Sequence, residues 1–296
     1  MSTPPAPNPS TAPATIPATW AALLDDAATF PPGDAPLGEA LAAHAEHRRA
    51  SYAALVGSFV ARDTDLPQVI AAGVPLSVIA TSGAGAIARP MALCARKGVE
   101  VAGLEIALRD LDDLPGNARR VAAAVDRARL EGDLGEDVPA YVELPQAEPT
   151  AGWLQAADVV ADNDLRLKFR TGGVEEHLHP SSAMLASWIE AALDRETPFK
   201  CTAGLHHAVR HRDPGTGFWQ HGFLNVLLAT RQSFDGEGID AVTGTLEEQD
   251  ASILVDRFGE LGEDTMARTR RWFTSLGTCS ITEPLDDLVA LGLVEL

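Results

Sequence analysis

Short apolar segments alternate with longer amphipathic ones over most of the chain. Six of the apolar segments have strand length and end at glycine, proline or charged residues; they span 52–60, 75–81, 99–108, 139–145, 165–171 and 198–204. The segments between them have helical spacing. The clearest are 117–133 and 181–196, whose apolar residues recur every three or four positions. The pattern therefore predicts strands that alternate with helices.

Such alternation predicts parallel β-α units, and six in succession favour a closed (β/α)₈ barrel over an open sheet. The pattern weakens toward the carboxyl end. There, 221–232 indicates a helix, 243–262 a short seventh strand, 276–281 a short eighth strand and 283–294 a closing helix. We therefore predict an α/β fold, a TIM-like (β/α)₈ barrel over 51–296 that is irregular at its seventh and eighth strands.

The amino-terminal 50 residues do not follow this rhythm. Residues 1–18 are rich in proline, alanine, serine and threonine without an apolar face, which predicts a disordered tail. Residues 19–50 hold two helical patterns separated by a Phe-Pro-Pro-Gly turn, which predicts an N-terminal helical cap. The tail has neither a basic nor an apolar region of the secretory kind, and we expect no membrane span.

Charge and cysteine content narrow the expected partners. The net charge of −19 repels nucleic-acid phosphates and anionic lipids, so a small-molecule substrate is expected, and a homo-oligomer stays open. Three cysteines do not make a disulfide framework in a chain of this length, which favours a cytoplasmic location. The segment 81–86, TSGAGA, lacks the third glycine of a dinucleotide fingerprint, and no cofactor is expected.

Lysine is rare in this chain. Of the 23 basic residues, only Lys97, Lys168 and Lys200 are lysines, and the others are arginines. A retained lysine therefore suggests that a primary amine is required. In a strand, alternate residues share a face, and the carboxyl ends of barrel strands surround the site. This geometry predicts a charged barrel mouth that contains Glu105, Glu143, Lys168, Arg170, Lys200 and Thr202.

Two interpretations of this mouth remain open. In the first, neighbouring cations disfavour the charge of a lysine, and the neutral amine attacks a carbonyl to form a Schiff base. Glu105 or Glu143 would then move the protons that carbon-carbon cleavage requires. In the second, the charges form a structural network in a non-catalytic ligand-binding barrel.

A resemblance adds to the first interpretation. The stretches KFRTGG and KCTAGL resemble the two lysine motifs of deoxyribose-phosphate aldolase, a class I aldolase barrel, and LGTCSI is similar to its phosphate-binding turn. The resemblance implies a Schiff base on Lys168, a supporting charge on Lys200 and proton relay by Glu105. It departs in three respects. Our count puts the lysines on strands five and six whereas the family has them on six and seven, Glu105 would replace an aspartate, and a long insert separates Lys200 from Gly277.

The residues themselves slightly favour Lys200 as the nucleophile, because its strand carries one cation rather than three, so both lysines stay open. Residues expected to contact a substrate follow the lysine strands or form the last turn: Arg170, Thr171, Gly172, Gly173, Thr202, His207, Gly277, Thr278 and Ser280. The backbone N–H groups of the last turn and the following helix would hold phosphate.

A wider resemblance covers most of the chain. The segments LLDDAATFPPG, KFRTGGV, PFKCTAGLHH and LGTCSITEPLDDL together are similar to a bacterial protein family with a barrel pattern and no assigned activity. This resemblance implies a fold and no function.

Six of the eight histidines fall within 177–221. His206 follows the Lys200 strand closely, where a general acid or base would be useful. His207 and His211 have the i, i+4 spacing that places two imidazoles on one side of a helix, as in zinc motifs. We expect no metal, but the 177–221 cluster leaves a metal-dependent lyase, isomerase or hydrolase with His207 and His211 as ligands as the alternative.

Overall fold

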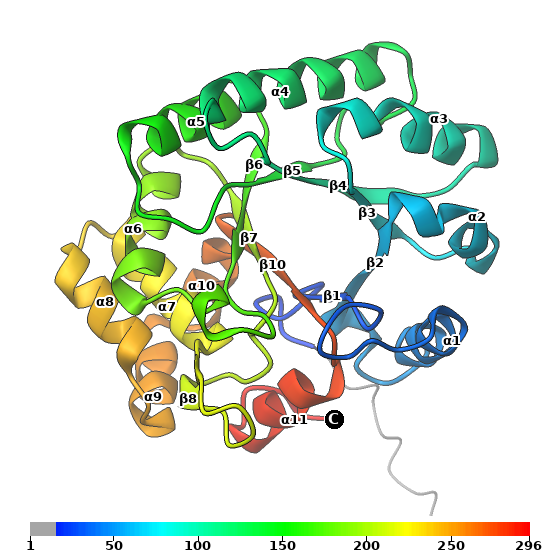
Figure 1. Ribbon diagram of the computed structural model, residues 1–296. Coiled ribbons are helices and arrows are strands. Elements are labelled where there is room, and N and C mark those ends of the chain that lie inside the picture. The colour runs from blue at the N-terminus through cyan, green and yellow to red at the C-terminus, as the bar shows by residue number, and fades with distance from the viewer. Residues whose placement is uncertain (1–15) are drawn as a thin grey trace, which may run out of the picture.

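Eight parallel strands close into a barrel in the computed structural model, which describes residues 16–296 (Figure 1). Around the ring, each strand pairs with the next one along the chain, and the last strand pairs with the first. The strands are β1 Leu24–Asp26, β2 Val56–Arg62, β3 Leu76–Ala80, β4 Val101–Ala107, β5 Ala140–Glu143, β6 Arg166–Arg170, β7 Phe199–Thr202 and β10 Phe273–Thr278. The predicted α/β barrel is confirmed.

Helices lie around the outside of this ring of strands (Figure 1). They are α1 Leu37–His47, α2 Leu66–Val69, α3 Ala88–Lys97, α4 Leu114–Leu130, α5 Ala151–Asp162, α6 Ser182–Leu193, α7 Phe223–Phe234, α8 Ile239–Glu247, α9 Ala251–Leu261, α10 Glu263–Thr269 and α11 Thr282–Ala290. The helix predicted from residue 181 begins at Ser182, because the Ser181 hydroxyl accepts a hydrogen bond from the amide of Met184. No helix in the described part of the chain is long and apolar enough to cross a membrane.

The segment 19–50, predicted as a cap, instead supplies the first barrel strand and the helix that follows it. Strand β1 pairs with β10 on one side and β2 on the other, so the barrel begins near Leu24 rather than at residue 51. The six strands predicted between residues 52 and 204 are therefore each one place later in the barrel than expected. Lys168 and Lys200 lie on the sixth and seventh barrel strands, as in the aldolase family, rather than on the fifth and sixth. Residues 1–15, most of the predicted tail, lie outside the described residues.

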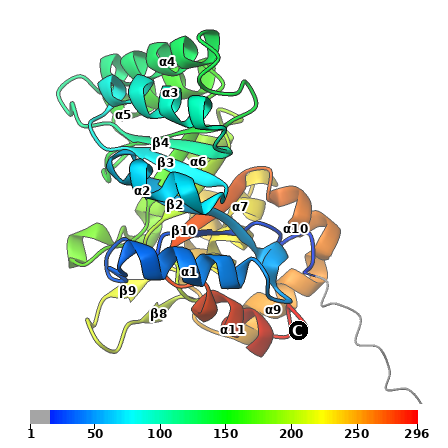
Figure 2. The ribbon, with the colours of Figure 1, turned by 90° about the vertical axis from the view of Figure 1, so that its right-hand side faces the viewer.

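The carboxyl-terminal part differs from the sequence prediction at one element. Residues 243–262, predicted to hold a strand, form parts of α8 and α9. The last barrel strand is β10, which begins three residues before the predicted segment 276–281. A short hairpin, β8 His211–Arg212 and β9 Trp219–Gln220, lies between β7 and α7 and projects away from the barrel strands (Figure 2).

Aromatic packing explains why the lysines face inward. On β6, β7 and β10, Phe169, Phe199 and Phe273 point outward and pack in a row, with ring centroids 5.1 and 5.6 Å apart. Trp188 of α6 lies against Phe169 at 5.6 Å. Because strand residues alternate between faces, burying these rings beneath the helices turns Lys168 and Lys200 into the barrel.

The turns that follow β6 and β7 touch through their glycines. A Cβ on Gly172 would lie 2.7 Å from the Cα of Gly204, so only glycine allows this approach. We predict that Gly172→Ala lowers the free energy of unfolding by about 1–3 kcal/mol, the usual cost of overpacking, in urea denaturation. Gly152→Ala in α5 is the control, since no atom lies within 4 Å of its added methyl. Equal stability of the two variants would contradict the close contact.

Candidate active site

Lys168 and Lys200 are register neighbours on β6 and β7, yet they open toward opposite ends of the barrel. Both side chains are almost fully buried, with 4% and 1% of their surface exposed. Lys168 lines a cavity of about 470 Å³ at the carboxyl ends of the strands. Lys200 lines a second cavity of about 380 Å³ at the amino ends. The two amines therefore face different cavities, and of the two only Lys168 lines the cavity at the mouth.

Glu105 of β4 connects the two lysines. Its Oε2 lies 2.7 Å from the Nζ of Lys168, and its Oε1 lies 2.7 Å from the Nζ of Lys200. Glu143 of β5 contacts Lys168 at 2.9 Å, and the Ser77 hydroxyl donates to Glu105 at 2.7 Å. The sequence placed both glutamates on the inner face of the barrel, and the structure brings them into one network with the lysines.

Asp25 completes this network and was missed by the sequence analysis. Its Oδ2 lies 2.7 Å from the Nζ of Lys200. The Ser58 hydroxyl donates to Oδ1 and the Ser275 hydroxyl donates to Oδ2, each at 2.7 Å. The available signal was a pair of aspartates directly after the buried pair Leu23 and Leu24. That signal was weak, because β1 has only three residues and no polar alternation.

The charges in the network favour the protonated form of both lysines, whereas the sequence predicted a neutral amine on one of them. Burial alone would lower the pKa of both lysines, but the carboxylates beside them outweigh it, and both pKa values are raised. Burial alone would raise the pKa of Glu105, but the ammonium groups of Lys168 and Lys200 hold it well below its ordinary value. Lys200 lowers the pKa of Lys168, as expected, but the three carboxylates around the pair outweigh this effect. The predicted net result, a lysine whose charged form is disfavoured, is therefore wrong.

This network predicts a loss of stability in acid. Glu105 and Glu143 have lowered pKa values in the folded protein, so their contribution to stability is present above the ordinary value of 4.5 and is lost as the pH falls through the folded values. We expect the free energy of unfolding, measured in urea, to fall as the pH drops below about 4.5. A Glu105→Gln variant should show a shallower fall. An unchanged slope in that variant would contradict the role of Glu105.

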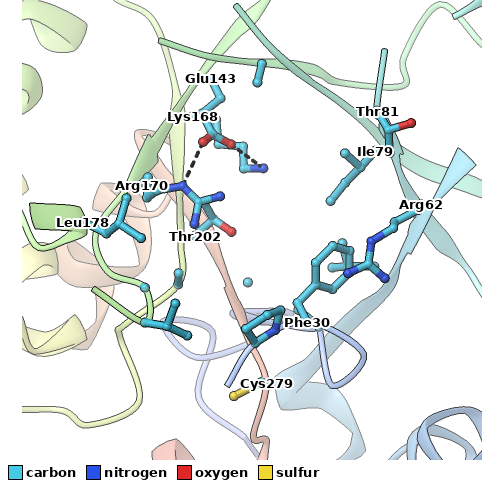
Figure 3. Close-up of a pocket in the computed structure, with 18 of the residues that line it drawn as sticks. Phe30, Arg62, Ile79, Thr81, Glu143, Lys168, Arg170, Leu178, Thr202 and Cys279 are labelled. Carbon is cyan, nitrogen blue, oxygen red and sulfur yellow. Dashed lines mark hydrogen bonds and ion pairs between the residues drawn. The ribbon is translucent and has the colours of Figure 1, made fainter. Parts of the chain in front are cut away.

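Arginine side chains lie near Lys168 in the lining of the mouth cavity, among apolar residues (Figure 3). Arg170 donates through Nε to Oε1 of Glu143 at 3.1 Å, and Glu143 also pairs with Lys168. Arg62 stacks over the ring of Phe30, with its Cζ 4.1 Å from the ring centroid. Arg109 also lines the cavity. Arg62 and Arg109, which the sequence analysis did not single out, thus add positive charge to a mouth in an acidic chain.

The residues expected to contact a substrate divide into two groups. Arg170, Gly173, Thr202 and Gly277 line the cavity. The others lie outside its lining: Thr171, Gly172, His207, Thr278 and Ser280. Thr171 is buried and donates its hydroxyl to the carbonyl of Ala203 at 2.6 Å, so it joins the two lysine turns. Thr278 donates its hydroxyl to the carbonyl of Ser280 at 3.0 Å, within the last turn. Phosphate binding by that turn stays a prediction.

The histidines do not share one site. His206 lines the cavity, and its Nδ1 lies 2.8 Å from Oε2 of Glu283. His207 pairs with Asp287 at 3.1 Å, and its ring lies 4.5 Å from that of His211. His211 belongs to the β8–β9 hairpin, so the helical spacing expected for these two is wrong. Within residues 16–296, no three His, Cys, Asp or Glu side chains are grouped to hold a metal ion.

Comparison with known proteins finds likeness in structure but no match in sequence. No protein-family model matches the sequence, and no curated protein is similar to it. A solved structure described as the unique tetrameric structure of deoxyribose phosphate aldolase from Aeropyrum pernix matches with a TM-score of 0.55 over 92% of each chain, at 12% identity. Identity this low shows likeness of fold. The chain therefore shares the (β/α)₈ barrel of this aldolase structure.

Proposed function

We propose that this chain is an aldolase-type lyase that acts on a small carbonyl compound through the amine of Lys168. One observation carries the proposal: the Nζ of Lys168 lies at the inner end of the mouth cavity, between the carboxylates of Glu105 and Glu143. Lys200, the rival nucleophile, lines the cavity at the other end of the barrel. The likeness in fold to an aldolase supports this assignment.

Glu105 and Glu143, which pair with the ammonium of Lys168, can also stabilise an iminium ion at the same nitrogen. In the resting state Lys168 is charged, and Glu143 at 2.9 Å is the group placed to accept its proton. The neutral amine adds to the carbonyl carbon, and two of the ammonium protons leave with the carbonyl oxygen as water. The product is again a cation at the same nitrogen. Glu105 and Glu143 therefore stabilise the charge of the intermediate without rearrangement.

Carbon-carbon cleavage then uses the iminium as an electron acceptor. A base removes the proton of a hydroxyl on the β carbon, counted from the iminium carbon. The bond between the α and β carbons then breaks, the β carbon becomes a carbonyl and an enamine forms. Glu143 and His206 both line the cavity and are the candidate bases. Glu105 and Lys200 continue the network beneath Lys168 and supply the supporting charge.

The cations at the mouth indicate an acidic substrate. Arg62, Arg109 and Arg170 line the cavity of a chain with a net charge of −19. Guanidinium groups bind carboxylate and phosphate in a bidentate manner, so we propose a small carbonyl compound that carries one of these groups. The aldolase with the similar fold is described as tetrameric, and for this chain a homo-oligomer is likewise a proposal.

Borohydride reduction tests the proposed imine. The protein is incubated with small aldehydes and 2-oxo acids, reduced, digested and examined by mass spectrometry. We expect an irreversible adduct on Lys168, with Lys97, the exposed lysine at the end of α3, as the internal control. Labelling of Lys168 no higher than that of Lys97 with every carbonyl compound would overturn the proposal.

A further inference from the structure

Three side chains from separate elements meet at the mouth cavity, away from Lys168. Cys279 directly follows β10, His206 lies in the turns after β7, and Glu283 lies in the first turn of α11. The Sγ of Cys279 is 3.6 Å from Nε2 of His206, within hydrogen-bond reach of a sulfur atom. The Nδ1 of His206 is 2.8 Å from Oε2 of Glu283. Thiol, imidazole and carboxylate thus form a continuous chain.

The carboxylate determines which imidazole nitrogen carries the proton. Burial would raise the pKa of Glu283, but the hydrogen bond and charge of His206 outweigh it and lower this pKa, so the carboxylate is ionised. An ionised carboxylate only accepts hydrogen bonds, so Nδ1 of His206 donates to it. In the neutral imidazole Nε2 is then an acceptor, and it faces the thiol of Cys279. This is the arrangement of a general base beside a nucleophile.

The sulfur is accessible from the cavity. Cys279 and His206 both line the cavity of about 470 Å³ that Lys168 also lines. Figure 3 shows Cys279 and Lys168 at different edges of this pocket. Gly33 packs closely on the cysteine, because a Cβ on Gly33 would lie 2.9 Å from the Cβ of Cys279. The close packing of Gly33 holds the backbone and Cβ of Cys279 in place, and Cys279 and Lys168 line the same cavity.

We propose that Cys279, His206 and Glu283 form a second nucleophilic site that binds an aldehyde covalently and reversibly. The thiol proton passes to Nε2 of His206, the sulfur bonds to the aldehyde carbon, and the imidazolium returns the proton to the carbonyl oxygen. The product is a thiohemiacetal, and no oxidant or leaving group is required. The site does not depend on an imine at Lys168, because the bond to the aldehyde carbon forms at the sulfur of Cys279. His206, one of the two candidate bases for the lysine mechanism, is the one group that both sites use.

The resting thiol is neutral at this site. Burial raises the pKa of Cys279, so the sulfur does not persist as a thiolate and depends on His206 to accept its proton. Such a thiol adds to aldehydes, which are strong electrophiles, in preference to carboxylates or amides. The ligand class of the site is therefore a small aldehyde.

Alkylation by iodoacetamide measures this activation. Mass spectrometry follows the modification of each cysteine, and the other two, Cys94 and Cys201, are fully buried and act as internal controls. We expect Cys279 of the native protein to react first. In His206→Gln, whose folding is checked by its thermal melting curve, the rate at Cys279 should fall about 100-fold, the lower end of what a placed general base contributes. Glu283→Gln, a change at a half-exposed side chain, should give a smaller fall. Unchanged rates in both variants would overturn the proposal.

Protection by propanal tests the aldehyde itself. Propanal should slow the alkylation of Cys279 in the native protein and equally in Lys168→Arg, whereas 1-propanol should protect neither. Protection in the native protein that is lost in Lys168→Arg would mean that the aldehyde binds only as an imine, and the thiohemiacetal would be refuted. Protection in both, without borohydride labelling of Lys168, would support the cysteine site while the proposed lysine mechanism fails.

Discussion

Lys168→Arg is expected to abolish imine trapping while the protein stays folded. A guanidinium keeps the positive charge between Glu105 and Glu143, but it does not lose a proton and does not attack a carbonyl. With a carbonyl compound that labels the native protein, the borohydride adduct should disappear. Turnover of a substrate, once one is identified, should fall by about 1,000-fold or more, as when a covalent nucleophile is removed from an enzyme.

Lys200→Arg is the matched control for this experiment. It makes the same chemical change at the neighbouring register position, on a side chain that lines the opposite cavity. The adduct on Lys168 should persist in this variant, at a reduced rate because the contacts of Lys200 with Asp25 and Glu105 are altered. If Lys168→Arg still forms an adduct and Lys200→Arg forms none, Lys200 is the nucleophile and our assignment is reversed.

Glu105→Gln is expected to cause the largest loss of stability among single changes in the barrel interior. The amide keeps the shape of the side chain but leaves Lys168 and Lys200 buried as neighbours without their shared counter-charge. Breaking a buried ion pair on one side usually costs about 3–5 kcal/mol. We expect a decrease of this order in the free energy of unfolding, measured by urea denaturation at pH 7.

Glu131→Gln provides the comparison at the surface. Glu131 pairs with Arg127 at 2.8 Å across one turn at the end of α4, where both side chains are well exposed. Exposed pairs of this kind contribute about 0.3–0.5 kcal/mol, so the variant should be nearly as stable as the native protein. A Glu105→Gln variant that is equally stable would show that the buried lysines lose their charge readily, contrary to the raised pKa values.

The regular part of the barrel was predictable because local patterns specify it. Apolar runs bounded by turn residues located the strands from β2 to β7, and alternation along β6 placed Lys168 on the inner face. Strand β1 was not recognisable, because three residues with two aspartates have no strand-like pattern. Its partners are β2 and β10, and β10 lies about 250 residues away. Only closure of the barrel makes this segment a strand.

The charge state of the lysines was also outside the reach of the sequence. Glu105 was assigned to the mouth, but whether its carboxylate lies between the two ammonium groups depends on the register of β4 through β7. Asp25, the ion-pair partner of Lys200, comes from a strand that the pattern did not show. Without Asp25, the predicted mouth contained three cations and two carboxylates. The pKa shift of the lysines is opposite to the expected one because carboxylates lie at ion-pair distance. Glu105 and Glu143 raise the pKa of Lys168, and Asp25 and Glu105 raise that of Lys200.

Local residue patterns were sufficient to predict the barrel class, the inward-facing residues of each lysine strand and the placing of two lysines on neighbouring strands. These follow from residue alternation and from the small number of folds that β-α repetition allows. The tertiary structure decided which lysine opens to the mouth, which carboxylates neutralise the pair, and that Cys279 meets His206 and Glu283. These depend on distances between side chains far apart in the chain, which are set by strand register and barrel closure and are not encoded in any local pattern.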